Sequence, residues 1–102
     1  MSAEIVYDFE WDGAKALANA AKHGVTFDQA ATVFLDALAL TVFDSAHSQT
    51  EERWFTLGHD ASGALLAVAH TYQVTGPAAR VRLISAREAT QREQRFYEDE
   101  PR

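Results

Sequence analysis

The chain has 102 residues, no cysteine and a formal net charge of −6. This length is typical of one domain, so we expect residues 1–102 to form a single unit. Disulfides and thiolate metal sites are excluded, and the sequence has neither the roughly 20 apolar residues of a membrane span nor a signal-peptide pattern, so we expect a cytoplasmic protein without membrane contact.

The first half of the chain predicts a short strand followed by a helix. Residues 5–9 form the strand, and Asp12 is the expected N-cap of a helix that ends at Gly24. Apolar residues recur at the spacing of one helical face, which we expect to point at the core: Ala14, Leu17, Ala18 and Ala21. Polar residues fall on the opposite face: Lys15, Asn19 and Lys22.

A second helix is predicted directly after the first. Thr26-Phe-Asp-Gln29 has the pattern of a capping box, in which the threonine and glutamine side chains satisfy free backbone groups at the start of a helix. The residues that follow make an apolar stripe at helical spacing: Phe27, Ala30, Ala31, Phe34 and Leu35. We interpret this stripe as part of the core.

From Ala37 onward the pattern changes to β-branched and aromatic runs separated by turn residues, which is typical of a strand meander. Strands are predicted near 38–43, 52–59, 64–72 and 79–85. Short connections favour antiparallel neighbours. Ser85-Ala-Arg-Glu88 resembles another capping box, which would open a helix that runs to about Glu98. The predicted class is α+β, with two N-terminal helices, an antiparallel sheet of about four strands and a C-terminal helix.

Charge is distributed unevenly along the chain. Residues 1–52 carry nine acidic residues and two lysines, whereas residues 53–95 carry six arginines and three acidic residues. Because the planar guanidinium group suits phosphate and carboxylate, the second half is a candidate anion-binding region. The alternative, ordinary solvated surface charge, has about equal weight.

Arg87 is the most informative of these arginines. If Ser85 caps a helix, Arg87 stands near its positive end, where a cation is unfavourable unless an anion offsets it. The alternatives are a salt bridge to a carboxylate such as Glu52, or simple exposure. Arg80 and Arg82 share one face of a predicted strand and are candidate phosphate ligands, but strict alternation would place Arg87 on the other face.

The four histidines have no metal-binding spacing, and we expect neither a metal site nor a cofactor. His70 alternates with Tyr72 on one strand; either is a candidate for proton transfer, although packing is the commoner role of such residues. His23 is first a helix C-terminal residue and second a candidate catalyst. The available side chains suit cleavage of RNA without a metal, in which a base deprotonates the 2′-hydroxyl, cations stabilise the phosphate and an acid protonates the leaving oxygen.

Several spaced segments resemble the BrnT toxins of type II toxin–antitoxin systems. They include Phe9-Glu-Trp-Asp12, Lys22-His-Gly-Val25, Val33-Phe-Leu-Asp36, Glu51-Glu-Arg53, Leu57-Gly58 and Ile84-Ser-Ala-Arg87. The resemblance implies a RelE-like ribonuclease that inhibits translation by cleaving RNA. It also implies a BrnA antitoxin as partner, whose ribbon-helix-helix part binds operator DNA, in an assembly of two toxins and two antitoxins.

The resemblance carries over Lys22, His23, Glu52, Arg53, Arg82, Arg87 and Tyr97 as candidate functional positions. Together with the chemistry of the side chains, it yields a catalytic set and an RNA-binding set. The catalytic candidates are His23, Glu52, Arg87 and Tyr97. The RNA-binding candidates are Lys22, Arg53, Arg80 and Arg82.

Three features depart from the family pattern. Gly13 and Ala37 stand where proline is frequent, and Gln73 replaces a frequent arginine, which removes one phosphate contact. The acidic net charge is also unusual for a protein that approaches RNA, because phosphate contacts dominate nucleic-acid affinity. The alternative function is a non-catalytic module whose same surface binds an acidic or apolar antitoxin segment and which acts as a transcriptional co-repressor.

Overall fold

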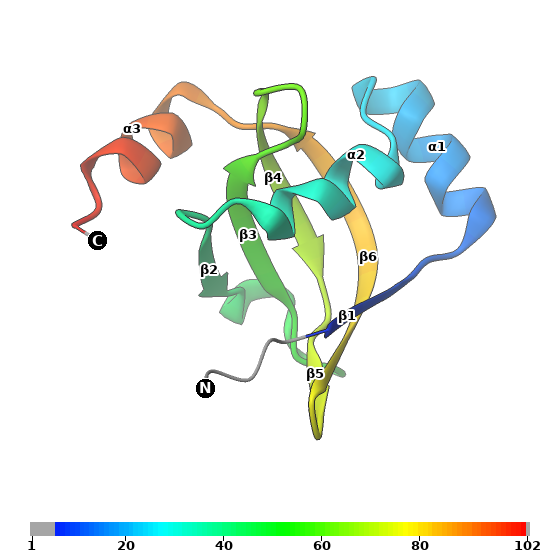
Figure 1. Ribbon diagram of the computed structural model, residues 1–102. Helices are drawn as coiled ribbons and strands as arrows, with labels where there is room; N and C mark the ends of the chain where they lie inside the picture. The colour runs from blue at the N-terminus through cyan, green and yellow to red at the C-terminus, as the bar shows by residue number, and fades with distance from the viewer. Residues whose placement is uncertain (1–5, 102) are drawn as a thin grey trace.

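The computed structural model describes residues 6–101 (Figure 1). Helices α1, α2 and α3 cover Gly13–His23, Phe27–Thr32 and Gln91–Asp99. Short 3₁₀ turns, η1 and η2, cover Val33–Leu35 and Ser45–His47. The strands are β1 Val6–Glu10, β2 Leu40–Phe43, β3 Trp54–His59, β4 Leu65–His70, β5 Gln73–Thr75 and β6 Ala78–Glu88. Ile5, which was expected in the first strand, lies outside the described residues.

The strands form one mixed sheet in the order β1-β6-β4-β3-β2, and β5 pairs with β6 as a short hairpin. The predicted sheet of about four antiparallel strands is therefore wrong in two respects. β1 pairs with β6 in parallel, and short connections could not reveal this pairing because the two strands lie at opposite ends of the chain. β5 was missed because its three residues fall between the predicted strands 64–72 and 79–85; the turn that joins it to β6 is made at Gly76, which has φ 60°.

The main core lies between the sheet and the two N-terminal helices, which cover one face (Figure 1). The predicted apolar stripe of the second helix is confirmed at Phe27 and Ala30, which are buried, while Ala31 and Phe34 pack at the margin of the core. It is wrong at Leu35, which is 81% exposed because the helix has by then given way to the 3₁₀ turn η1. The deepest core residues come from α2, β4 and β6: Phe27, Ala30, Leu66, Val68, Val81, Leu83 and Ala86. β1 adds Tyr7 and Phe9 at its margin.

Helix α1 is rotated relative to the prediction. Leu17, expected in the core, is 76% exposed, whereas Asn19, expected on the solvent face, is only 6% exposed. The reason is a set of hydrogen bonds from the Asn19 side chain. Its Nδ2 donates to the carbonyl oxygens of Ala86 (2.8 Å) and Val25 (2.9 Å), and its Oδ1 accepts from the Ala86 N–H at 3.0 Å. The polar face of α1 therefore packs beside β6.

Strand β6 is longer than predicted and contains an irregularity. Its pairing with β4 shifts between His70, which opposes Leu83, and Ala69, which opposes Ser85. Ile84 is the extra residue of this β-bulge, so the inward and outward positions of β6 exchange parity. Ser85 is consequently a strand residue and not a helix cap; the correct cap of α3 is Thr90, which forms a capping box with Glu93.

The second face of the sheet is covered at one end by α3. Tyr97 packs there against Leu57 and Ala67. Gly58 lies on the opposite face of β3 beneath η1, where a Cβ atom would approach Val33 Cγ1 to 2.8 Å. This position requires glycine because the turn packs directly on the strand backbone. Within the described part of the chain, no helix has the length and apolar character needed to cross a membrane.

Replacement of Asn19 by alanine should destabilise the protein by about 2–4 kcal/mol, because it leaves buried backbone groups of Ala86 and Val25 without their partners. Urea denaturation of Asn19→Ala measures this loss. The matched control is Leu17→Ala on the exposed side of the same helix, which should change the free energy of unfolding by less than about 0.5 kcal/mol. Equal effects of the two substitutions would contradict the assigned role of Asn19.

Candidate functional site

Three arginines of β6 lie on one face of the sheet. Arg80 and Arg82 precede the bulge and Arg87 follows it, so the change in parity places all three opposite the buried Val81 and Ala86. Strict alternation predicted that Arg87 lies on the face opposite Arg80 and Arg82, and this prediction is wrong because of the bulge. β6 therefore presents a line of basic side chains on the face that α1 and α2 do not cover.

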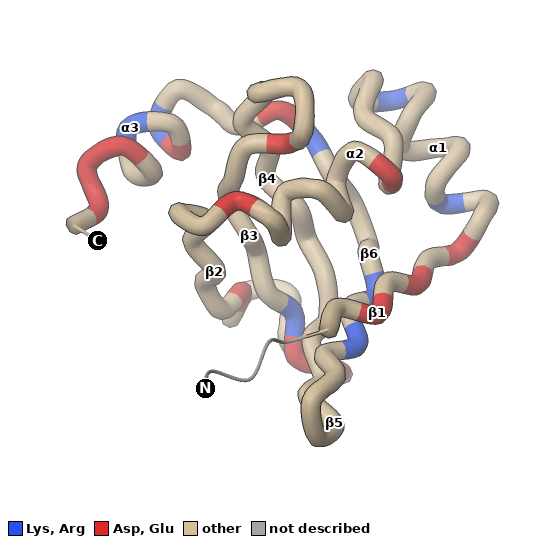
Figure 2. Tube along the Cα trace, viewed as in Figure 1, with Lys and Arg blue, Asp and Glu red and all other residues tan. Residues whose placement is uncertain are grey.

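The end of β6 near Arg80 and Arg82 forms a polar pocket of about 290 Å³. Glu10, Glu51 and Glu52 line it together with these two arginines, so carboxylates outnumber guanidinium groups. Figure 2 shows the same mixture, with acidic positions of β1 beside basic positions of β6. The pocket is consequently a poor site for a polyanion while its carboxylates are ionised.

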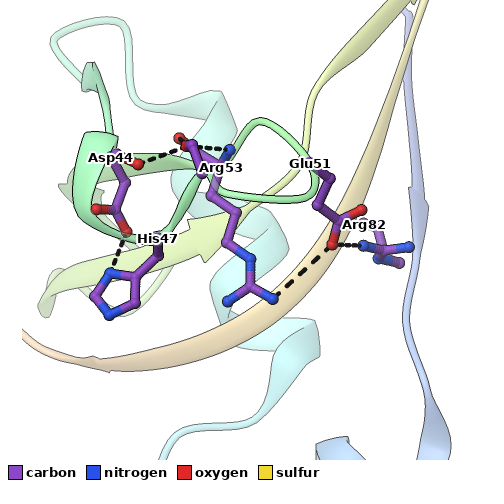
Figure 3. Close-up of polar contacts among 6 residues, drawn as sticks. Asp44, His47, Glu51, Arg53 and Arg82 are labelled. Carbon is purple, nitrogen blue, oxygen red and sulfur yellow. Dashed lines mark hydrogen bonds and ion pairs between the residues drawn. The ribbon is translucent and has the colours of Figure 1, made fainter.

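Glu51 links two of the predicted RNA-binding residues. It forms an ion pair with Arg82, and Arg53 Nη2 lies 3.9 Å from the same carboxylate (Figure 3). The loop that carries Arg53 is held by its own backbone, because the Asp44 N–H donates to the Arg53 carbonyl at 2.8 Å. His47, on the same loop, pairs with Asp44 at 2.9 Å (Figure 3).

Arg87 does not sit at a helix N-terminus as the sequence suggested; it is a strand residue that pairs with the first turn of α3. Its Nη1 and Nη2 donate to the two carboxylate oxygens of Glu93 at 2.7 and 3.1 Å. This two-point hydrogen bond raises the pKa of Arg87 and lowers the pKa of Glu93. The predicted alternative of a salt bridge from Arg87 to a carboxylate is therefore correct, but the partner is Glu93 and not Glu52.

Tyr97 is 6% exposed and fixes α3 to the rest of the molecule. Its hydroxyl donates to Asp36 Oδ2 at 2.6 Å and lies 3.3 Å from His59 Nδ1. Burial raises the pKa of Asp36, but the hydrogen bonds from Tyr97 and from the backbone N–H groups of His59 and Leu38 outweigh it, so the pKa is lower than usual. Tyr97 thus has a clear structural role beside its predicted catalytic one.

A second, acid-free cleft lies where the polar face of α1 meets β6; we call it the α1–β6 cleft. It has a volume of about 220 Å³ and is lined by Lys15, Ala18, Asn19, Lys22, His23, Ile84 and Ser85. Two lysines, a histidine and a serine hydroxyl converge here without a carboxylate among the lining residues. The composition of this cleft suits a phosphate better than that of the pocket beside Arg80 and Arg82.

The structure divides the predicted site residues among several places. Lys22 and His23 line the α1–β6 cleft, while Glu52, Arg80 and Arg82 line the pocket at the other end of β6. Arg53 lies beside that pocket, and Arg87 and Tyr97 make their side-chain contacts around α3. The catalytic set His23, Glu52, Arg87 and Tyr97 is therefore not gathered in one pocket.

Lys15 and Ser85 are lining residues that the sequence analysis did not select. Lys15 was assigned to the solvent face of α1, and Ser85 to a helix cap. The available signal was the spacing of Lys15, Asn19, Lys22 and His23, which places all four on one face of a helix. Within residues 6–101, no group of three or more histidine, aspartate and glutamate side chains is arranged to hold a metal ion.

Comparison with known proteins places the chain among the toxins of type II toxin–antitoxin systems. The family described as "Ribonuclease toxin, BrnT, of type II toxin-antitoxin system" matches residues 11–93. The chain belongs to this family. The matched residues include both lysines and the histidine of the α1–β6 cleft, while Tyr97 lies beyond them.

The fold agrees with a crystal structure of the ribonuclease toxin BrnT from Brucella abortus. The superposition has a TM-score of 0.56 and 24% sequence identity, and it covers 88% of this chain and all of the other. At this identity the likeness establishes a shared α+β fold. A search of curated proteins found no match.

The ion pair between Arg87 and Glu93 should make stability depend on pH. Because the pKa of Glu93 is lower in the folded protein than its ordinary value of 4.5, its stabilisation is present above that value and is lost as pH falls through the folded pKa. Glu93→Gln removes the charge but keeps an oxygen for the capping box. The stability difference between the unchanged protein and Glu93→Gln should be present at pH 7 and shrink in acid, as urea denaturation can measure.

The matched control for this experiment is Glu98→Gln, an exposed position on the same helix. It should leave the pH dependence of unfolding nearly unchanged. A difference between the unchanged protein and Glu93→Gln that stays constant from neutral to acid pH would contradict the assigned ion pair.

Proposed function

We propose that this protein is an endoribonuclease that cleaves RNA without a metal ion and holds the reacting phosphate in the α1–β6 cleft. The supporting observation is the convergence of Lys15, Lys22, His23 and Ser85 in a cleft without acidic lining residues. Membership of a ribonuclease toxin family supports RNA as the substrate. Cations of this kind stabilise the charge that accumulates on a phosphate in the transition state.

In this proposal the 2′-hydroxyl oxygen attacks the adjacent phosphorus and forms a 2′,3′-cyclic phosphate, while the bond from phosphorus to the 5′-oxygen breaks. His23 takes the proton of the 2′-hydroxyl or returns a proton to the 5′-oxygen, because histidine is the commonest general acid–base side chain. Lys15 and Lys22 hold the non-bridging phosphate oxygens, and Ser85 donates a hydrogen bond.

The arginines of β6 extend the proposed RNA path away from the cleft. A strand rises about 3.3 Å per residue, so positions 80 and 87 are separated by about 23 Å, a length that several nucleotides span. Arg82 and Arg80 would contact phosphates along this path once their side chains separate from the carboxylates beside them. Glu52 lines the pocket at the other end of β6 and Tyr97 is buried beside α3, so neither lies at the reacting phosphate, and the second proton is exchanged with solvent. Arg53 stays a candidate for RNA binding.

The family also implies an antitoxin partner. We propose that a BrnA-type antitoxin with a ribbon-helix-helix part neutralises the toxin, in an assembly of two copies of each chain, and that the complex contacts operator DNA only through the antitoxin. Without this partner, RNA cleavage would inhibit translation and stop growth.

Replacement of His23 by glutamine should lower the rate of RNA cleavage by at least about 100-fold, because general acid–base catalysis contributes this much or more. Lys22→Ala should lower it as well, with a smaller loss at high salt, because salt already weakens the phosphate contact that this substitution removes. The matched control is His47→Gln, an exposed histidine on the η2 loop, which should keep full activity. Cleavage of a labelled RNA by purified, folded variants measures all three.

A specific observation also favours the alternative function, a non-catalytic module that binds an acidic antitoxin segment and acts as co-repressor. Arg53, Arg82 and Arg87 already face carboxylates, as they would in such a complex. The two functions separate in one experiment, in which purified protein is incubated with RNA in the presence of EDTA. Cleavage that depends on His23 supports the nuclease; inactivity of the folded protein together with tight antitoxin binding supports the alternative.

A further inference from the structure

A second cavity lies on the helix-covered face of the sheet, outside the α1–β6 cleft. Its volume is about 370 Å³, and it is lined by Tyr7, Phe34, Thr41, Trp54, His70 and Tyr72. It shares no lining residue with the α1–β6 cleft. Five of its six lining side chains are aromatic rings, and we call it the aromatic cavity.

The rings of the aromatic cavity are fixed by contacts with each other. Phe34 packs edge-on against His70 with 5.0 Å between ring centroids, and Tyr7 lies 5.5 Å from Phe34. Trp54 is held from outside the cavity by Phe43 at 5.1 Å. These contacts leave a rigid, flat-sided space of the kind in which a planar ring stacks.

Behind the cavity wall, a chain of hydrogen bonds runs from His70 through Thr56 to Thr41. This chain determines whether the Thr41 hydroxyl offers a ligand a donor or an acceptor. His70 is fully buried, and burial lowers its pKa, so the neutral ring carries one N–H. The Thr71 carbonyl, 2.9 Å from Nδ1, can only accept, so Nδ1 donates and Nε2 accepts from the Thr56 hydroxyl at 2.7 Å.

The direction of donation in this chain of hydrogen bonds also fixes the role of Thr41 at the cavity wall. The Thr56 hydroxyl donates its only hydrogen to His70, so it accepts a hydrogen bond from the Thr41 hydroxyl at 2.8 Å. Thr41 therefore has no hydrogen left for a ligand and presents lone pairs only. His70 is fully satisfied and fully buried, so it supports the wall from behind Phe34.

Trp54 contributes its indole ring to the wall. Its Nε1 is buried and has no hydrogen-bond partner among residues 6–101, so this N–H is not offered to a ligand in the cavity. The cavity thus combines stacking surfaces with one acceptor, Thr41 Oγ1.

We propose that the aromatic cavity binds one unstacked nucleobase of the RNA that the protein cleaves. A nucleobase is a planar ring with donors and acceptors on its edge, and stacking of bases on aromatic side chains is the usual way in which single-stranded RNA is recognised. The inference rests on the proposed nuclease function and adds a base-reading site at a distance from the reacting phosphate. An apolar side chain of a partner protein would fill the space but leave the acceptor unused.

The test uses the fluorescence of Trp54 in the full chain. The sequence has two tryptophans, so Trp11→Phe leaves Trp54 as the single reporter. We expect saturable quenching on titration with at least one of the four nucleoside 5′-monophosphates, and weaker quenching with the others. Stacking of a base near the indole ring is the physical cause.

Two cavity variants in the Trp11→Phe background should weaken this binding. Thr41→Val removes the acceptor with little change in shape and should raise the dissociation constant about 3- to 10-fold. Tyr72→Leu removes a stacking surface and should raise it about 5- to 150-fold. The matched control is Thr75→Val, an exposed position on β5 outside the cavity, which should bind as before.

The outcomes separate this inference from the proposed nuclease. Because binding does not require cleavage, a folded His23→Gln protein should still bind the preferred nucleotide. Cleavage of RNA without nucleotide-dependent quenching, or equal binding by Thr41→Val and Thr75→Val, would overturn the base-binding cavity and leave the nuclease standing. Tighter binding of N-acetyl-phenylalaninamide, which does not emit at the wavelengths of tryptophan, than of every nucleotide would instead assign the cavity to an aromatic side chain of a partner protein and overturn the inference.

Discussion

The hydrogen bonds between the Asn19 amide and the backbone of Ala86 determine how the functional surface is assembled. β1 pairs with β6 only from Ala78 to Arg82, so the backbone of Ala86 extends beyond this pairing. The side-chain amide offers one donor and one acceptor in the geometry of a neighbouring strand. Because this contact fixes the rotation of α1, it also places Lys22 and His23 against β6, where the α1–β6 cleft forms.

The β-bulge at Ile84 is the second constraint. A single additional residue exchanges the faces of β6, so that Arg87 joins Arg80 and Arg82 while Ala86 stays in the core. Without it, the same sequence would direct Arg87 into the apolar layer beneath α2, where a charge is costly. The bulge therefore lets β6 bury its apolar residues on one face and place all three arginines on the other. A strand with regular alternation cannot do both with this sequence.

Local charge matters more than total charge in this protein. The net charge of −6 is unfavourable for binding RNA as a whole, yet three acidic residues gather around Arg80 and Arg82 and the α1–β6 cleft has none among its lining residues. Glu93 neutralises Arg87 in the same way. The guanidinium groups of Arg82 and Arg87 are thus already paired with carboxylates of the same chain.

The sequence by itself determined the elements whose signals are local: the ends of α1 at Asp12 and Gly24, the capping box at Thr26, the runs of β3 and β4, and the family to which the chain belongs. Tertiary structure decided the features that depend on contacts distant in the chain. The parallel pairing of β1 with β6 and the burial of Asn19 are two of these. The periodicity of a helix shows which of its faces is polar, but it does not show what that face contacts. Asn19 is buried because it hydrogen-bonds the backbone of Ala86, which is 67 residues away in the sequence.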